Sequence, residues 1–167
     1  EDSVEHGGGG MKLRTEDMAK FTYFLLHRGE WEGKQLLRTS WFDRACVKQI
    51  ETLHDSENHT GDWGMGYGYQ CWMGTQAGSF RADGAYGQFG LVYPALDLIV
   101  VMTTATEQTQ TLLTSLAKYL LPAVKEQPLP ESIASTSLKG ELEHLALPMV
   151  HGDRCPHLEK KLDAQVY

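Results

Sequence analysis

Two short patterns place a serine close to a residue that could manage its proton. Ser115 stands three residues before Lys118, and Ser56 stands two residues before Asn58. A serine hydroxyl attacks a carbonyl only when a neighbouring group takes its proton, which both patterns could provide. Ser115, however, lies inside a run with helical apolar spacing, and Ser56 lies in a polar stretch. Four-residue matches also arise readily by chance, so neither serine is predicted to be a nucleophile.

Near the end of the chain, four residues of metal-binding type stand at short spacing: His151, Asp153, Cys155 and His157. Imidazole, thiolate and carboxylate groups bind zinc in proteins. Structural zinc sites usually combine two such ligand pairs, whereas this chain has no second pair, and Pro156 interrupts the local geometry. We therefore expect a solvated tail with no metal, and no cofactor elsewhere in the chain.

The elements that would position any site are concentrated between residues 64 and 104, where four consecutive antiparallel strands are predicted. The first run alternates with a strict period of two, with three glycines on one face. The last run is apolar without alternation from Leu98 to Met102, which predicts burial on both faces. The expected strands cover residues 64–73, 79–82, 88–94 and 97–104. Aromatic residues around the first run could line a cleft, although such a stripe more often belongs to a core.

Helical spacing predicts four helices around these strands. The first begins at Thr15 as N-cap and ends near Gly29, and four glycines before it (residues 7–10) suggest a tight backbone crossing. The second has Trp41, Ala45 and Ile50 facing inward. The expected helices cover residues 15–29, 40–51, 108–121 and 137–147. Proline and serine enrichment predicts a linker at 127–136, between a domain over 1–126 and an appended region over 137–167.

Composition excludes several classes of function. The 167 residues suit one domain, carry a net charge of −7, and contain no cluster of Lys or Arg, which argues against a nucleic-acid or anionic-membrane partner. No apolar run reaches the roughly 18 residues that a membrane span needs. Three cysteines at wide spacing, Cys46, Cys71 and Cys155, suggest free thiols. A chain that starts with Glu1 looks like an interior start, which leaves a cytoplasmic and an exported location equally open.

Six segments, in this order, resemble the closing half of serine hydrolases of the β-lactamase and penicillin-binding-protein fold. The resemblance covers about the first three quarters of the chain and is strongest to the class C-like branch of esterases, D-amino-acid peptidases and nylon-oligomer hydrolases. The segments are residues 8–21 (GGGMKLRTEDMAKF), 28–34 (RGEWEGK), 66–72 (GYGYQCW), 82–88 (ADGAYGQ), 92–94 (VYP) and 98–101 (LIVV).

The resemblance implies an α+β fold, with an antiparallel sheet flanked by helices that forms the C-terminal portion of a β-lactamase-like domain. It also implies acyl transfer by a serine from an S-x-x-K element, a second Y-x-N or S-x-N element, and a third element such as Lys-Thr-Gly. In that order S-x-x-K comes first, so Ser115 is out of place. The chain has no Y-x-N, and the family's nucleophile is missing from it.

The third element is present in altered form, with Ala82 at the lysine position and Asp83 at the threonine position. Loss of the lysine removes a cation for a substrate carboxylate, which puts β-lactam recognition in doubt. By resemblance, the backbone N–H of Ala85 is one oxyanion donor. Substrate binding is assigned by resemblance to Asp83, Gly84, Tyr86, Gly87 and Gln88. Without the resemblance, the same residues would be interpreted as a hairpin turn, and Asp83 as a turn residue.

We therefore expect a fragment of a hydrolase that acts on amide, ester or lactam bonds and is inactive alone. The alternative is a non-catalytic binding or structural module on the same scaffold. The expected partners are a small-molecule or peptide-like substrate, and either the missing N-terminal half or a second copy at the edge of strand 97–104. No nucleic acid or membrane is expected.

Overall fold

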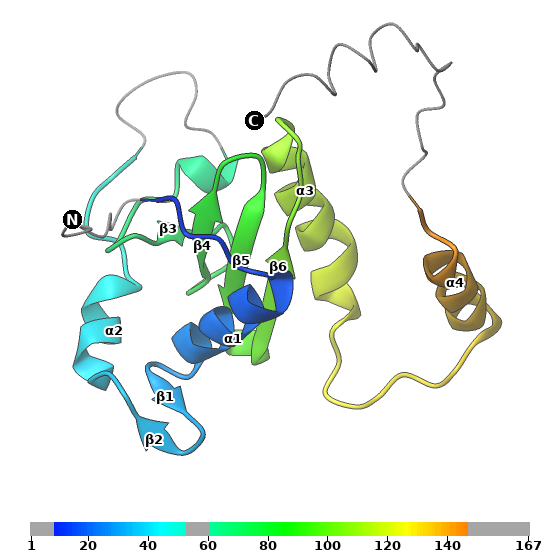
Figure 1. Cartoon of the computed structure of the whole chain (residues 1–167), viewed down its shortest axis with the longest axis horizontal. Coiled ribbons are helices and arrows are strands. Elements are labelled where there is room, and N and C mark those ends of the chain that lie inside the picture. The colour runs from blue at the N-terminus through cyan, green and yellow to red at the C-terminus, as the bar shows by residue number, and fades with distance from the viewer. Residues whose placement is uncertain (1–8, 53–60, 147–167) are drawn as a thin grey trace, which may run out of the picture. The chain divides into compact units, whose positions relative to one another are not determined.

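The predicted strands form one antiparallel sheet in which neighbours in sequence are neighbours in space (Figure 1). The computed structural model describes residues 9–52 and 61–146. The sheet has four strands in the order β3-β4-β5-β6. Their bounds are Trp72–Met73 for β3, Phe80–Gly84 for β4, Gln88–Tyr93 for β5 and Leu98–Met102 for β6. Short links of turn residues explain this simple order, because each strand returns directly along the previous one.

The two faces of β5 carry different side chains and pack against different helices. Leu25 of α1 (Thr15–Leu26) packs with Val92 on one face. Leu113 of α3 (Thr109–Ser115) packs with Phe89 and Leu91 on the other face. Helical structure continues after α3 through η4 (Leu116–Leu120) and η5 (Leu121–Ala123). The α+β prediction, with a sheet flanked by helices, is therefore confirmed.

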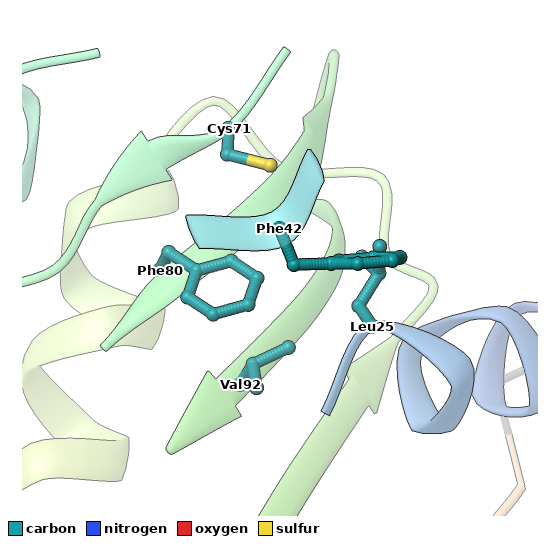
Figure 2. Packing of buried hydrophobic residues seen from close by; sticks show 5 residues of the cluster. All are labelled: Leu25, Phe42, Cys71, Phe80 and Val92. Atoms are coloured by element: carbon teal, nitrogen blue, oxygen red, sulfur yellow. The ribbon is translucent and has the colours of Figure 1, made fainter. Parts of the chain in front are cut away.

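The first core joins two helices to two strands of the sheet. Leu25 from α1, Phe42 from α2 (Thr39–Ala45), Cys71, Phe80 and Val92 form one buried cluster. Figure 2 shows these side chains converging between the two helices and the sheet. Burial of this apolar area is the main force that holds α1 and α2 on the sheet.

Helix α1 packs directly over Gly90 of β5, where no side chain separates the two elements. A Cβ at position 90 would clash with Oγ1 of Thr22, a residue that is only 1% exposed. The Thr22 hydroxyl donates to the carbonyl of Met18 at 2.7 Å, so its polar group is satisfied within the helix. Any larger residue at position 90 would push α1 away from the sheet.

The first predicted strand is much shorter than expected, and the prediction for residues 64–73 is wrong in extent. Gly66 and Gln70 have φ values of 107° and 61°, which break an extended backbone. Only single bridges from Tyr67 to Ile50 and to Trp72 precede β3. The period-two pattern there reflects a bent segment, not a strand.

The helix predicted at 40–51 is also shorter, since α2 ends at Ala45. The amides of Gln49 and Ile50 leave the helical path and donate to the carbonyl of Tyr67 at 2.9 and 3.1 Å. Ala45 is buried as predicted, but Trp41 and Ile50 are 43% and 59% exposed, so their inward placement is wrong. A hairpin of β1 (Glu30–Trp31) and β2 (Lys34–Gln35) separates α1 from α2.

The start of α1 also differs from the prediction. Arg14 is the N-cap residue and makes no side-chain cap, while Thr15 is already helical. The Thr15 hydroxyl instead lies 3.0 Å from the hydroxyl of Thr103. The expected tight crossing of the glycine run is not seen at Gly9 or Gly10, where a Cβ would meet nothing within 4 Å. The two glycines before them lie outside the described residues.

Strand β6 is only half-buried along its length, so the prediction of full burial on both faces is wrong in degree. Its side chains do reach both faces: Val100 and Met102 join the α3 cluster, and Val101 pairs with Gly90 on the α1 side. The exposure arises because, within the described residues, β6 pairs with β5 alone. Its second edge has no partner strand there.

The chain divides into two compact units, Glu1–Val124 and Lys125–Tyr167. In the second unit, α4 (Ile133–Glu143) begins four residues before the predicted start at residue 137, within the stretch expected to be a linker. A capping box explains the early start: the amide of Ser135 donates to the Ser132 hydroxyl at 3.1 Å, and the reverse bond measures 2.9 Å. None of the described helices is long and apolar enough to cross a membrane.

Candidate functional site

A tight turn joins β4 to β5 at the position of the altered third element. Gly84 pairs with Gln88, so Ala85, Tyr86 and Gly87 form the loop. Tyr86 and Gly87 have φ values of 62° and 88°, and the amide of Gly87 donates to the carbonyl of Gly84 at 3.3 Å. Glycine is required at position 87, because a Cβ there would clash with Oγ1 of Thr104. The turn is therefore narrow and strictly shaped.

Thr104, just after β6, holds this turn in place. Its hydroxyl donates to the carbonyl of Tyr86 at 2.6 Å, and the carboxamide of Gln88 donates to the carbonyl of Thr104. The amide of Thr106 donates to the same Tyr86 carbonyl at 3.2 Å. Three bonds from one neighbouring segment thus restrain the loop. Thr104 is not among the residues predicted from the sequence, because its only signal there is its place after an apolar run.

Ala85 occupies the exposed tip of the turn. Within the described part of the chain, its N–H donates to no protein acceptor. The neighbouring Tyr86 side chain is 61% exposed, so solvent or a ligand can approach the tip. An exposed, unpartnered N–H on a restrained loop is a ready donor for an external acceptor.

The strand that leads to Ala85 has an open outer edge. β3 pairs with only the first two residues of β4, through Trp72 with Arg81 and Met73 with Phe80. In the described ranges, the remaining residues of β4, from Ala82 to Gly84, have no strand beside them on that edge. Free backbone donors and acceptors therefore run directly up to the turn, and an extended ligand could pair with them.

A hollow of about 450 Å³ lies on the α1 face of the same hairpin. Its lining is mainly apolar, with Lys12 as a basic residue on its wall. The residues that line it from the hairpin are Ala82, Asp83, Gly84, Gln88 and Gly90, and those from the helix side include Met11, Leu13, Met18 and Phe21. Ala82 pairs with Gly90 on this face, so the position that carries lysine in the family's third element faces an apolar wall.

On the opposite face of β4, Arg81 is a fully buried cation, with only 1% of its surface exposed. Its Nε donates to Oδ2 of Asp83 at 2.8 Å, and its Nη1 lies 3.3 Å from the carbonyl of Met73. The guanidinium carbon lies 4.5 Å from the ring centroid of Trp63 and 5.8 Å from that of Trp72. Aromatic faces stabilise a cation electrostatically, which offsets part of the cost of burying it.

Two of the aromatic residues near the first run, Trp63 and Trp72, therefore line the guanidinium. The rings of Trp63 and Trp72 lie 5.2 Å apart, and the rings of Tyr67 and Trp72 lie 4.9 Å apart. Tyr69, by contrast, is 40% exposed. Arg81 is not among the residues predicted from the sequence, because a lone arginine in a strand is ordinarily interpreted as solvent-exposed.

The Asp83 carboxylate belongs to this buried pair and faces away from the hollow. Burial raises its pKa, while the hydrogen bond and the charge of Arg81 lower it, and burial prevails. Asp62 extends the network: its carboxylate accepts from the amide of Thr75 at 3.2 Å and from the carboxamide of Gln110 at 3.0 Å. The predicted contact of Asp83 with a substrate stays a prediction, as does the binding role of Gly84, Tyr86, Gly87 and Gln88.

The other candidate residues are not brought to this site. Ser115 is the exposed last residue of α3, and the amine of Lys118 lies 4.9 Å from the ring of Tyr119. Ser56 and Asn58 lie outside the described residues, as does the cluster from His151 to His157. Among residues 9–52 and 61–146, no group of three or more His, Cys, Asp or Glu side chains could hold a metal ion.

A family model described as Beta-lactamase matches residues 1–125. The chain belongs to this family. The resemblance inferred from six segments in the family's order is therefore confirmed. The hydrolase family that it implies is confirmed with it. Curated proteins gave no match.

Among solved structures, the chain is similar to a Bacillus anthracis protein assigned as a putative 6-aminohexanoate-dimer hydrolase. The identity is 22%, and the TM-score is 0.48. The match covers 67% of this chain but only 30% of the solved one. This chain thus spans less than a third of the length of that structure, and so distant a likeness supports no conclusion about activity.

Replacement of Arg81 by methionine should lower the free energy of unfolding by about 3–5 kcal/mol, because it leaves the buried Asp83 carboxyl without its cation. The matched control is Lys20→Met, which removes the exposed ion pair of Lys20 with Asp17 on α1. That change should leave the free energy of unfolding nearly unchanged, because solvent screens an exposed ion pair. Urea unfolding followed by tryptophan fluorescence measures both. Equal losses for the two variants would contradict the structural role of Arg81.

Proposed function

We propose that this chain is the closing part of a serine hydrolase that cleaves amide, ester or lactam bonds through an acyl-enzyme. The serine nucleophile would come from a part of the protein outside this 167-residue chain. The observation that carries the proposal is the exposed Ala85 N–H, which lacks a protein acceptor among the described residues and directly follows the open edge of β4. Membership of the β-lactamase family supplies the reaction class.

In such a reaction, a serine Oγ attacks the carbonyl carbon of the substrate and the carbonyl oxygen gains negative charge. The Ala85 N–H would donate to that oxygen, as one of two backbone donors. The donor is useful only if it is held in place before the charge develops. The bonds of Thr104 and Thr106 to the carbonyl of Tyr86 provide that restraint. The turn then needs no reorganisation as the oxyanion forms.

The acyl part of the substrate would lie along the free edge of β4 as an added strand. The main chain of Asp83 offers a donor and an acceptor there, because the backbone groups of Ala82 and Gly84 point toward β5. An added strand gains its affinity from such bonds. The absence of a side chain on Gly84 permits a close approach. Tyr86 is exposed at the tip of the turn, where it could flank the leaving group.

The mainly apolar hollow on the α1 face points to a substrate with an apolar acyl part. Ala82 offers no cation, and Leu13, Met18 and Phe21 contribute apolar surface. The cation that the family's lysine would give a β-lactam carboxylate is therefore absent from position 82, and Lys12 is the basic residue that lines the hollow. We therefore propose ester or amide substrates with an apolar acyl part in preference to β-lactams.

The second candidate function is a non-catalytic binding or structural module. The observation that favours it is the altered third element, in which Ala82 replaces the lysine, together with a chain that carries no S-x-x-K in the family's order. A module of this kind would keep the open edge of β4 and bind an extended ligand without cleaving it. The two candidates differ only in whether an activated serine is brought to Ala85.

The isolated chain should not react with a fluorophosphonate probe, which labels only serines that a neighbouring base activates. Intact-mass analysis after incubation with excess probe measures the labelling. The Ser115→Ala variant is the control, and it should give the same unlabelled mass. Stoichiometric labelling that disappears in Ser115→Ala would show that the chain carries its own nucleophile.

In the longer protein, Ala85→Pro should lower kcat by about 10²–10³, because proline has no N–H for the oxyanion. Ala85→Ser is the matched control, since it keeps the N–H at the same exposed position and should retain kcat within about twofold. Steady-state hydrolysis of a chromogenic ester gives both values, and thermal unfolding shows whether the fold is kept. If Ala85→Pro remains folded with kcat within a few-fold of the parent, the assignment of Ala85 is wrong.

We also propose that a strand from the remaining part of the protein covers the outer edge of β6. The run from Leu98 to Met102 contains no charge, proline or glycine, and nothing in it opposes edge-to-edge pairing. The isolated chain should therefore self-associate, with an average mass in light scattering that rises with concentration. A monomer at high concentration, in which the amides of both Val100 and Val101 resist hydrogen exchange, would contradict the proposal.

A further inference from the structure

Two of the three cysteines, far apart in the sequence, meet in the first core. Cys46 directly follows α2, and Cys71 directly precedes β3. Both are free thiols. Cys71 is 4% exposed and belongs to the buried cluster with Phe42, and the half-buried Cys46 packs against that cluster. Figure 2 shows the Cys71 side chain at this cluster.

The backbone around the two cysteines explains why they meet. The amide of Tyr69 donates to the carbonyl of Ala45 at 2.9 Å, and Tyr67 forms an antiparallel bridge with Ile50. Between these points, a Cβ on Gly68 would clash with the carbonyl oxygen of Ala45. The segments 45–50 and 67–71 therefore run side by side with no side chain between their backbones. Cys46 and Cys71 stand at the same end of this contact.

The two thiols interact directly. A hydrogen bond between their side chains raises the pKa of Cys46, the donor, and lowers the pKa of Cys71, the acceptor. Burial opposes the effect on Cys71, because it disfavours a thiolate. The two thiols therefore form a coupled pair at the edge of the first core, and either sulfur can react first as the thiolate.

We propose that Cys46 and Cys71 form a reversible disulfide when the chain meets hydrogen peroxide, a two-electron oxidant small enough to enter the core. The thiolate of one cysteine attacks one peroxide oxygen, so an S–O bond forms, the O–O bond breaks and hydroxide leaves. The sulfur of the other cysteine then attacks the sulfenic sulfur, so the S–S bond forms and the S–O bond breaks. The departing oxygen takes the remaining proton as water. In total, two thiols and one peroxide give one disulfide and two waters.

The bond would tie the end of α2 to the segment that enters β3. The next residue, Trp72, pairs with Arg81 and lies over its guanidinium. A covalent link at residue 71 would therefore restrain β3, the strand that pairs with the start of β4. It would also close a loop in the unfolded chain, which favours the folded state. This inference stands independently of the proposed hydrolase activity.

The test uses the full chain with Cys155→Ser, which leaves the two core cysteines as its only thiols. After treatment with hydrogen peroxide, the protein is alkylated under denaturing conditions and weighed. We expect a mass lower by two hydrogen atoms, no alkylation, a peptide that joins Cys46 to Cys71, and full recovery of both thiols with dithiothreitol. The matched controls add Cys46→Ala or Cys71→Ala, and each should retain no intramolecular link.

A second readout asks whether the bond suits the native packing. The oxidised chain should unfold at a higher temperature than the reduced chain, and the difference should vanish after reduction. Two alkylated thiols after peroxide treatment, or links only between separate molecules, would overturn the proposal. So would an oxidised chain that unfolds at the same or a lower temperature than the reduced one.

Discussion

The buried guanidinium of Arg81 is the interaction on which the candidate site depends. Arg81 is only 1% exposed, and burial of its charge lowers the stability of the fold unless neighbouring groups compensate for the lost hydration. Here the compensation comes from several elements at once: the carboxylate of Asp83 on β4, the carbonyl of Met73 on β3 and the ring of Trp63. Because these groups must converge on one cation, their relative positions are restricted. The next residue, Ala82, begins the part of β4 whose outer edge has no strand beside it in the described ranges.

Side chains alternate between the two faces of β4, so those that stabilise the sheet lie on one face and those beside the hollow lie on the other. Arg81 and Asp83 point toward the α3 face, where they hold the sheet together, while Ala82 and Gly84 belong to the face covered by α1. A residue needed for the buried pair therefore cannot also contact a ligand in the hollow with its side chain. Recognition is left to backbone groups and to the turn. This arrangement is consistent with a strand that presents its edge, and not its side chains, to a substrate.

Much of the sheet could be predicted because its signals are local. The glycine-rich turn before Gln88 and the apolar run from Leu98 predicted β4, β5 and β6 nearly to their observed bounds, and the order of short segments predicted the family. Features that depend on distant contacts could not be predicted. The burial of Arg81, the meeting of Cys46 with Cys71 and the restraint of the turn by Thr104 each join residues whose proximity exists only after folding. The assigned roles at the turn remain predictions, since no ligand tests them.

The most direct test of the account is the hydrogen exchange rate of the Ala85 amide in the native chain, measured by NMR. The account predicts exchange close to that of an unstructured peptide, because this N–H is exposed and donates to no acceptor in the described part of the chain. The amide of Val92, in the centre of the sheet, should be strongly protected in the same sample. An Ala85 amide that exchanges as slowly as that of Val92 would show that the N–H already donates to another acceptor. It would then not be available to donate to an oxyanion.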